Sequence, residues 1–139
     1  MEYIIASGPV IIENEKVLLD KDGRDSFWKF PGGKIEMSDL TDAEHSLEAA
    51  ARRKVKEELD LDIEIVRPLK PMMIMKPVIN DEDKNTLVVL IHWLSKRNGE
   101  VVPGGNTTEW AWHDIHNLPS DCAPNIRPVI EDYLTRTNP

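Results

Sequence analysis

The stretch that decides the fold is 27-FWKFPGGKIEMSDLTDAEHSLEAAARRKVKEELDL-61, a Pro-Gly-Gly turn followed by a long helical pattern. Two adjacent glycines, Gly32 and Gly33, allow a sharp turn and a close approach of the backbone to a ligand. Thr41 and Glu44 have the spacing of a capping box, which predicts a helix that starts near Asp42. Apolar residues then recur every four positions and predict its buried face: Ala43, Leu47, Ala51, Val55 and Leu59.

The predicted helix carries paired acids near its end. Glu57 and Glu58 are adjacent, and helical geometry places Lys54 with them on a flank about 100° from the apolar face. On a surface helix, such charge is more often a solvated face. Beside a glycine turn, however, the pair also suits Mg²⁺, which needs only one or two carboxylates besides carbonyl, water and phosphate oxygens. The residues alone leave these two interpretations about evenly balanced.

Strand patterns lie on both sides of this helix. Residues 2–13 and 16–19 predict a hairpin, and residues 86–94 are the most apolar run and predict the central strand. Further strands are predicted at residues 61–69, 72–79 and 109–112, and a second helix at residues 125–135. Strands before and after a long helix, with another helix at the end, predict an α/β fold in which helices cover a mixed sheet.

Composition narrows the function classes. The 139 residues suit one domain, and 30% charged with 40% apolar residues argue against disorder. A net charge of −8 disfavours nonspecific binding to a nucleic-acid polymer or a membrane, but a cation held by carboxylates still presents positive charge to a small phosphorylated ligand. No apolar run approaches the roughly 20 residues of a membrane span, and no signal-peptide pattern is seen. The single cysteine, Cys122, excludes an internal disulfide and suits a cytoplasmic location.

PGGKIE followed by RRKVKEELDL resembles the signature of the Nudix hydrolases, G-x5-E-x7-R-E-U-x-E-E-x-G-U, in which U is a bulky aliphatic residue. The aromatic lead-in at residues 28–34 and the segments at residues 109–119 are also similar to that family. The resemblance covers most of the chain, although its specificity comes mainly from residues 28–61. It implies one Nudix-like domain, residues 1–139, folded as an α/β/α sandwich with a mixed sheet.

The resemblance also implies roles for the matching residues. Gly33 matches the first glycine of the signature, whose carbonyl commonly touches a metal ion in this family. Arg53 matches the arginine that orients the glutamates through an ion pair. Glu57 and Glu58 match the paired metal ligands.

The chain departs from the signature in the loop before the helix. Counted forward from Gly33, the first glutamate of the signature falls on Asp39. Counted back from Arg53, it falls on His45, beside Glu44, because the loop is longer by six residues. Asp39 and Glu44 are therefore alternative candidates for the missing acid, and a third alternative is that neither replaces it.

Two further departures lie in the helix. Lys54 replaces the glutamate after the arginine, which should lower metal affinity. The site then works with its remaining acids, or binds a nucleotide with little hydrolysis, or uses Lys54 as a point charge for phosphate. Asp60 replaces the closing glycine, and aspartate tolerates left-handed backbone angles better than most residues.

The resemblance implies hydrolysis of a nucleoside diphosphate linked to another moiety, above all of a nucleoside triphosphate to monophosphate and pyrophosphate, with Mg²⁺ or alternatively Mn²⁺. The expected catalytic residues are Glu57, Glu58, Arg53 and Glu44, and the expected metal ligands are Gly33, Glu57 and Glu58. The expected substrate contacts are Lys34 to phosphate, Trp28 by stacking on a base and Asn125 to a base edge. Two alternatives stay open: a noncatalytic nucleotide-binding or regulatory module, and an ADP-ribose or diadenosine-polyphosphate hydrolase. The expected partner is a small nucleotide, bound by a monomer or a homodimer.

Overall fold

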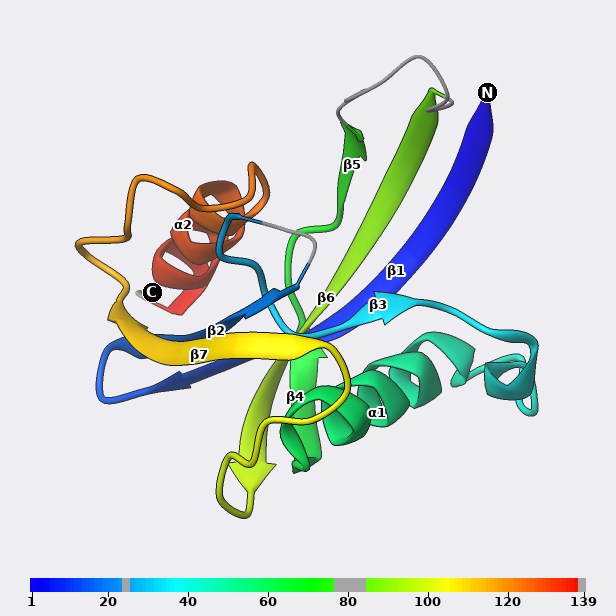
Figure 1. The fold of residues 1–139 in the computed structure, drawn as a ribbon, viewed down its shortest axis with the longest axis horizontal. Coiled ribbons are helices and arrows are strands. Elements are labelled where there is room, and N and C mark those ends of the chain that lie inside the picture. The colour runs from blue at the N-terminus through cyan, green and yellow to red at the C-terminus, as the bar shows by residue number, and fades with distance from the viewer. Residues whose placement is uncertain (24–25, 77–84, 138–139) are drawn as a thin grey trace.

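One mixed sheet carries the fold, and two helices pack on it (Figure 1). The computed structural model describes residues 1–23, 26–76 and 85–137. The strands are β1 (Glu2–Glu13), β2 (Lys16–Asp22), β3 (Gly33–Lys34), β4 (Asp62–Pro68), β5 (Met72–Met75), β6 (Thr86–Asn98) and β7 (Thr107–Asp114). The helices are α1 (Ser46–Leu59) and α2 (Ile126–Thr137), with a short 3₁₀ turn, η1 (Met37–Asp39). Residues 77–79 of the predicted fifth strand lie outside the described residues.

The sheet order is β4-β6-β1-β2-β7, with β3 added to β1 and β5 added to β6. β1 and β6 run parallel over ten paired positions, whereas the other strand pairs are antiparallel. The predicted hairpin is confirmed: β1 turns into β2 through Asn14 and Glu15, which both have positive φ, as a two-residue hairpin turn requires. In the described part of the chain, no helix has the length and apolar character to cross a membrane.

Alternation along the hairpin builds two cores. Val10, Val17 and Leu19 point to one face and pack with Ile126 and other residues of α2. Their neighbours point to the other face and pack with α1 in a second core, formed by Ile11, Leu18, Val55, Leu59, Leu61 and Ile63. The sheet is therefore covered on both faces, which confirms the α/β/α sandwich.

α1 begins at Ser46, four residues after the start predicted near Asp42. The carboxylate of Asp42 accepts the N–H of Glu44 over 3.0 Å and contacts the ring of His45 at 2.6 Å. The carbonyl of Asp42 also accepts the Ser46 hydroxyl. These bonds close a separate turn ahead of the helix, so the predicted capping box is wrong and Ala43 is exposed instead of buried.

The end of α1 is tied to the loop that leads into β7. Asp60 adopts the left-handed conformation predicted for the residue that replaces glycine, with φ 57° and ψ 34°. The carbonyl of Glu58 accepts the N–H of Gly104 over 2.8 Å and the hydroxyl of Thr107 over 3.2 Å. The last helical turn, which carries the paired acids, is thus held between the sheet and this loop.

Candidate active site

The glycine turn is locked against β1. Gly32 has φ 136°, and a Cβ there would lie 2.7 Å from both the Cα of Gly8 and the carbonyl oxygen of Ser7. A Cβ on Gly8 would lie 2.1 Å from the carbonyl oxygen of Pro31. Glycine is therefore required on both sides of this contact. The turn held in this way donates the N–H of Gly32 to Oε2 of Glu58 over 3.3 Å.

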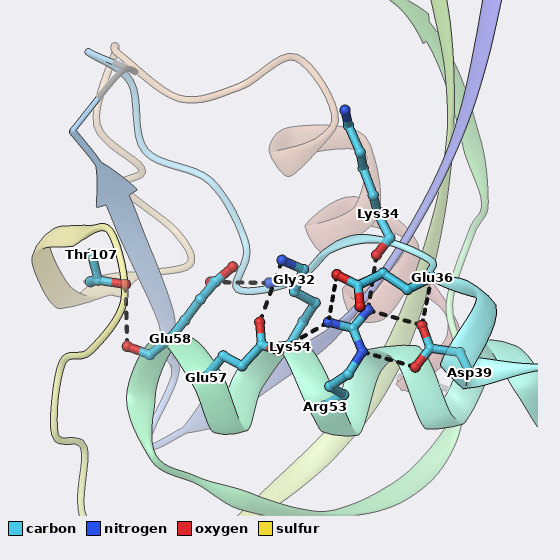
Figure 2. A network of polar contacts seen from close by, with 9 residues as sticks. All are labelled: Gly32, Lys34, Glu36, Asp39, Arg53, Lys54, Glu57, Glu58 and Thr107. Atoms are coloured by element: carbon cyan, nitrogen blue, oxygen red, sulfur yellow. Dashed lines mark hydrogen bonds and ion pairs between the residues drawn. The ribbon is translucent and has the colours of Figure 1, made fainter.

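Arg53 gathers the charged groups on one side of the turn (Figure 2). Its Nε and Nη2 donate to the two carboxylate oxygens of Asp39, each over 2.9 Å. Its Nη1 donates to Glu57 over 3.1 Å and lies 3.4 Å from Glu36, while Nη2 also donates to the Lys34 carbonyl over 3.1 Å. This bidentate contact lowers the pKa of Asp39, which is buried. We call this group the Arg53 clamp.

The structure thus brings Asp39, and not Glu44, to Arg53. The six extra residues of the loop follow Asp39, where they form the turn closed by Asp42. That turn keeps Glu44 exposed and outside the cleft described below. The assignment of Glu44 as a catalytic residue is therefore corrected: the acid that meets the arginine is Asp39.

On the other side of the glycine turn from the Arg53 clamp, the acids Asp20 and Glu58 lie close together. The carboxylate of Asp20, on β2, lies against that of Glu58, on α1. Asp20 is 1% exposed, and neither of its carboxylate oxygens has a hydrogen-bond partner among the described residues. Burial, together with the charge of Glu58, raises the pKa of Asp20 to about 9, and burial raises the pKa of Glu58 as well. We call Asp20 and Glu58 the acid pair. Two buried carboxylates in contact repel each other unless they share a proton or bind a cation.

Both groups open onto one cleft of about 460 Å³. Its charged lining includes Asp20, Glu57 and Glu58 as acids and Lys29, Lys34 and Lys54 as bases. Gly32 and Gly33 lie in the same wall. Carboxylates mixed with ammonium groups suit a polyanion that is held both through a cation and by direct charge contacts.

The lysines of the cleft differ in their placement. Lys54 lies over the glycine turn, because a Cβ on Gly33 would meet its Cε at 2.9 Å. The Nζ of Lys54 is 3.5 Å from the carboxylate of Glu57. Lys34 is exposed and extends away from the Arg53 clamp (Figure 2). Lys29 donates to Asp22 over 2.7 Å.

An apolar cavity of about 200 Å³ adjoins the cleft, and both are lined by Lys29, Gly32 and Gly33. Asn125 lines this cavity and contacts Nε2 of His92 through its Nδ2 over 2.9 Å. The Nδ1 of His92 lies 2.8 Å from the Lys70 carbonyl, which only accepts, so Nδ1 carries the proton and Nε2 is the acceptor. Asn125 therefore donates one N–H of its side-chain amide to His92, which fixes the orientation of that amide.

Trp28 lies elsewhere. Its ring packs edge-on against His113 at a centroid distance of 4.5 Å, and the Nζ of Lys21 lies 4.7 Å from its centroid. Trp28 lines neither the cleft nor the apolar cavity. Among the three predicted substrate contacts, the structure therefore places Lys34 at the cleft and Asn125 at the apolar cavity, whereas Trp28 lines neither.

The family model of the NUDIX domain matches residues 4–133. The chain belongs to the Nudix family. Nudix membership supports a hydrolase that acts on compounds containing a nucleoside diphosphate, without deciding which one. Among curated proteins, no sequence gives a significant match.

Solved structures share the Nudix fold at low sequence identity. A MutT NUDIX hydrolase from Burkholderia pseudomallei has a TM-score of 0.70 and 19% identity, over 95% of this chain and 98% of that one. The ORF135 protein of E. coli has a TM-score of 0.74 and 19% identity, over 99% and 93% of the two chains. A UDP-X diphosphatase has a TM-score of 0.67 and 15% identity, over 99% and 66%. At such identities the likeness establishes the fold alone.

Nudix hydrolases generally use divalent metal ions, and the residues of this cleft fit one. Among the described residues, no group of three His, Cys, Asp or Glu side chains is placed to hold a metal ion. Asp20 and Glu58 nevertheless face each other without donors for Asp20, and Mg²⁺ needs few protein carboxylates when phosphate and water complete its shell. Glu57, by contrast, is 51% exposed and is engaged by Arg53 and Lys54. The fit is to a cation held jointly with a phosphorylated substrate.

Asp20 and Lys29 line the Nudix cleft although no sequence motif indicated them. Both lie outside the signature, and their backbones pair with each other over 2.9 and 3.0 Å. One signal was present: Asp20 follows Leu18 by two positions, so alternation puts both on one face of the strand. Nothing in the local sequence reveals that this face meets the end of α1.

Proposed function

We propose that this Nudix protein hydrolyses a nucleoside diphosphate linked to another moiety, with a nucleoside triphosphate cut to monophosphate and pyrophosphate as the leading reaction. The reaction requires Mg²⁺ or Mn²⁺. One observation carries the proposal: a charged cleft of about 460 Å³ and an apolar cavity of about 200 Å³ meet at Lys29 and the glycine turn. A nucleotide has the same two parts, a polyphosphate and an apolar base, joined through a sugar.

The residues of the cleft have distinct tasks in this proposal. A bound divalent cation neutralises phosphate charge and lowers the pKa of water, which makes the nucleophile available at neutral pH. Glu58 would hold the cation, with its carboxylate oriented by the N–H of Gly32. Glu57 and the carbonyl of Gly33 are the further ligands implied by the family signature. Arg53 is a positioning residue, because it fixes Glu57 relative to the buried Asp39.

Charge and shape then orient the substrate. The ammonium groups of Lys29 and Lys34 line the cleft and attract phosphate oxygens. In the cavity, the side-chain amide of Asn125 is oriented by His92, and in this proposal its oxygen accepts from a donor on the base. Burial lowers the pKa of His92, so its ring stays neutral and keeps accepting from Asn125 at neutral pH.

The test is a pyrophosphate-release assay over the common nucleoside and deoxynucleoside triphosphates, ADP-ribose, diadenosine tetraphosphate and a UDP-sugar. We expect pyrophosphate from at least one triphosphate with Mg²⁺ or Mn²⁺, and none with EDTA. Glu58→Gln should lower kcat by about 100-fold or more, because it removes a ligand of the cation. Glu131→Gln, on the exposed surface of α2, is the matched control and should leave the rate unchanged.

One observation favours a second candidate, a noncatalytic nucleotide-binding module. Lys54 lies in the cleft where the signature has an acid, and it contacts Glu57. Isothermal titration calorimetry distinguishes the two: micromolar binding of a triphosphate with no release of pyrophosphate would contradict hydrolysis and support the module. Turnover of ADP-ribose or diadenosine tetraphosphate alone would keep the family chemistry but replace the leading substrate.

A further inference from the structure

Asp20 is a buried acid for which the described chain supplies no donor. It is 1% exposed, and both carboxylate oxygens lack a hydrogen-bond partner among the described residues. The nearby ammonium group of Lys29 donates to Asp22 over 2.7 Å. Buried polar groups in native proteins are almost always partnered, and an exception calls for a missing ion, water or ligand. We therefore expect the carboxylate of Asp20 to interact with a cation or with a protonated group.

Two different elements, β2 and α1, bring the carboxylates of Asp20 and Glu58 together. Asp20 shares a strand face with Leu18, which packs in the core under α1. Glu58 comes from the last turn of α1 and is held by the N–H of Gly32. A carboxylate from the sheet and one from the helix thus meet at the wall of the cleft. Carboxylates held on a strand and a helix form a more precise site than carboxylates on loops.

The charges of the cleft also favour a cation site at Asp20. In the family signature, the helix carries a glutamate at the position of Lys54, and in this chain a lysine replaces that glutamate. Asp20 lies outside the signature, on β2, and adds one carboxylate to the lining of the cleft. We propose that Asp20 is a ligand of the divalent cation and supplies from β2 the acid that α1 lacks at position 54. This inference rests on the proposed function, because the cation is the one that hydrolysis requires.

The chemistry of the donors selects the kind of cation. Asp20 and Glu58 offer hard carboxylate oxygens, and neither histidine nor cysteine is among the described residues of the cleft. Such a set suits Mg²⁺ and Mn²⁺, whereas thiolate and imidazole sites select zinc or copper. Mn²⁺ is therefore a suitable probe, since it replaces Mg²⁺ at oxygen sites and its free concentration is measured directly by electron paramagnetic resonance.

The experiment measures Mn²⁺ binding without substrate, by electron paramagnetic resonance, for the wild type, Asp20→Asn and Glu109→Gln. Glu109 is a matched control, because it is an exposed carboxylate on β7 opposite Lys21, the neighbour of Asp20. We expect Kd to rise at least tenfold in Asp20→Asn and less than twofold in Glu109→Gln. Thermal melting in EDTA checks the fold: Asp20→Asn should melt at or above the wild-type temperature, while its increase in Tm with Mn²⁺ shrinks.

The outcomes separate this inference from the proposed function. If the wild type binds Mn²⁺ and Asp20→Asn binds it equally well, Asp20 is not a ligand, and the proposed hydrolysis stands. If the wild type binds no Mn²⁺ at millimolar concentration without substrate, Asp20 and Glu58 do not hold a cation by themselves and this inference is overturned, while the pyrophosphate-release assay with Mg²⁺ or Mn²⁺ still decides the proposed function. Should Asp20→Asn fail to fold, Asp20→Ser carries the same expectation, because it also removes the carboxylate without adding volume.

Discussion

The Arg53 clamp and the acid pair lie on two sides of one glycine turn. Each contains a buried aspartate, but only the aspartate of the clamp accepts hydrogen bonds from the described residues. Asp39, with a side chain that is 4% exposed, accepts two bonds from Arg53 and the N–H of Glu36 over 2.8 Å. Asp20, 1% exposed, accepts none from the described residues. The pKa of Asp39 is lowered and that of Asp20 is raised to about 9. A buried acid with donors contributes to stability, whereas a buried acid without donors is a candidate functional residue.

The largest expected effect breaks the clamp. Arg53→Met leaves the carboxylate of Asp39 buried without its cation, and should lower the free energy of unfolding by about 3 kcal/mol. Urea denaturation measures this loss. Lys56→Met is the control, since Lys56 pairs with the exposed Asp60, and it should change stability far less. A loss for Arg53→Met no larger than that of the control would mean that solvent already screens Asp39.

The second prediction concerns pH, and the two regions should respond with opposite signs. Between about pH 4 and pH 9, folded Asp20 holds a proton that the unfolded chain has released, because burial and Glu58 raise its pKa. Metal-free protein should therefore lose stability as pH rises through this window, by up to about 1.4 kcal/mol per pH unit between pH 6 and pH 8. Urea denaturation in EDTA measures the slope, and Asp20→Asn should flatten it. An equally steep loss in Asp20→Asn would assign the slope to another group.

Asp39 gives the opposite sign. Its pKa is lowered by Arg53, so its contribution to stability is complete above the ordinary aspartate pKa of 3.8 and is lost as pH falls below that value. Asp39→Asn should therefore be less stable than the wild type at pH 5, and this difference in the free energy of unfolding should become smaller as the pH falls to 3. A deficit that stays constant over this range would show that Asp39 is not ionised in the folded protein.

A smaller effect is expected at Lys54, which lines the cleft beside Glu57. Lys54→Glu replaces a positive charge by a negative one beside Glu57, in the cleft that Asp20 also lines, so the affinity for Mn²⁺ should rise about tenfold. Lys56→Glu makes the same charge change at an exposed position of α1 and should raise it far less. Unchanged affinity in Lys54→Glu would mean that the cation lies far from this flank of the helix. If affinity rises but turnover of the triphosphate falls, Lys54 contacts phosphate.

The smallest effect is expected at the rim of the clamp. Glu36 lies 3.4 Å from Nη1 of Arg53, but its side chain is 56% exposed. Exposed ion pairs contribute little, so Glu36→Gln should cost about 0.3 kcal/mol in urea denaturation. A cost similar to that of Arg53→Met would make Glu36, and not Asp39, the main partner of the arginine.

By itself, the sequence determined the parts of this protein that depend on local periodicity. The strand patterns and the four-residue recurrence of apolar residues in α1 predicted a mixed sheet covered by helices, which the structure confirms. The Pro-Gly-Gly turn and the left-handed Asp60 followed from backbone sterics, which act on single residues. The spacing from Arg53 to Glu58 placed the acids at the end of one helix and carried the Nudix resemblance.

Only the tertiary structure decided which acids meet. Asp39 and Glu44 were equivalent by counting, and the choice fell to Asp39 because Asp42 closes a turn that keeps Glu44 in solvent. The start of α1 shifted to Ser46 for the same reason. The contact of Asp20 with Glu58 joins residues far apart in the chain, and no local pattern encodes it. Such a contact depends on how a strand face and a helix end pack together, which is set by the core as a whole.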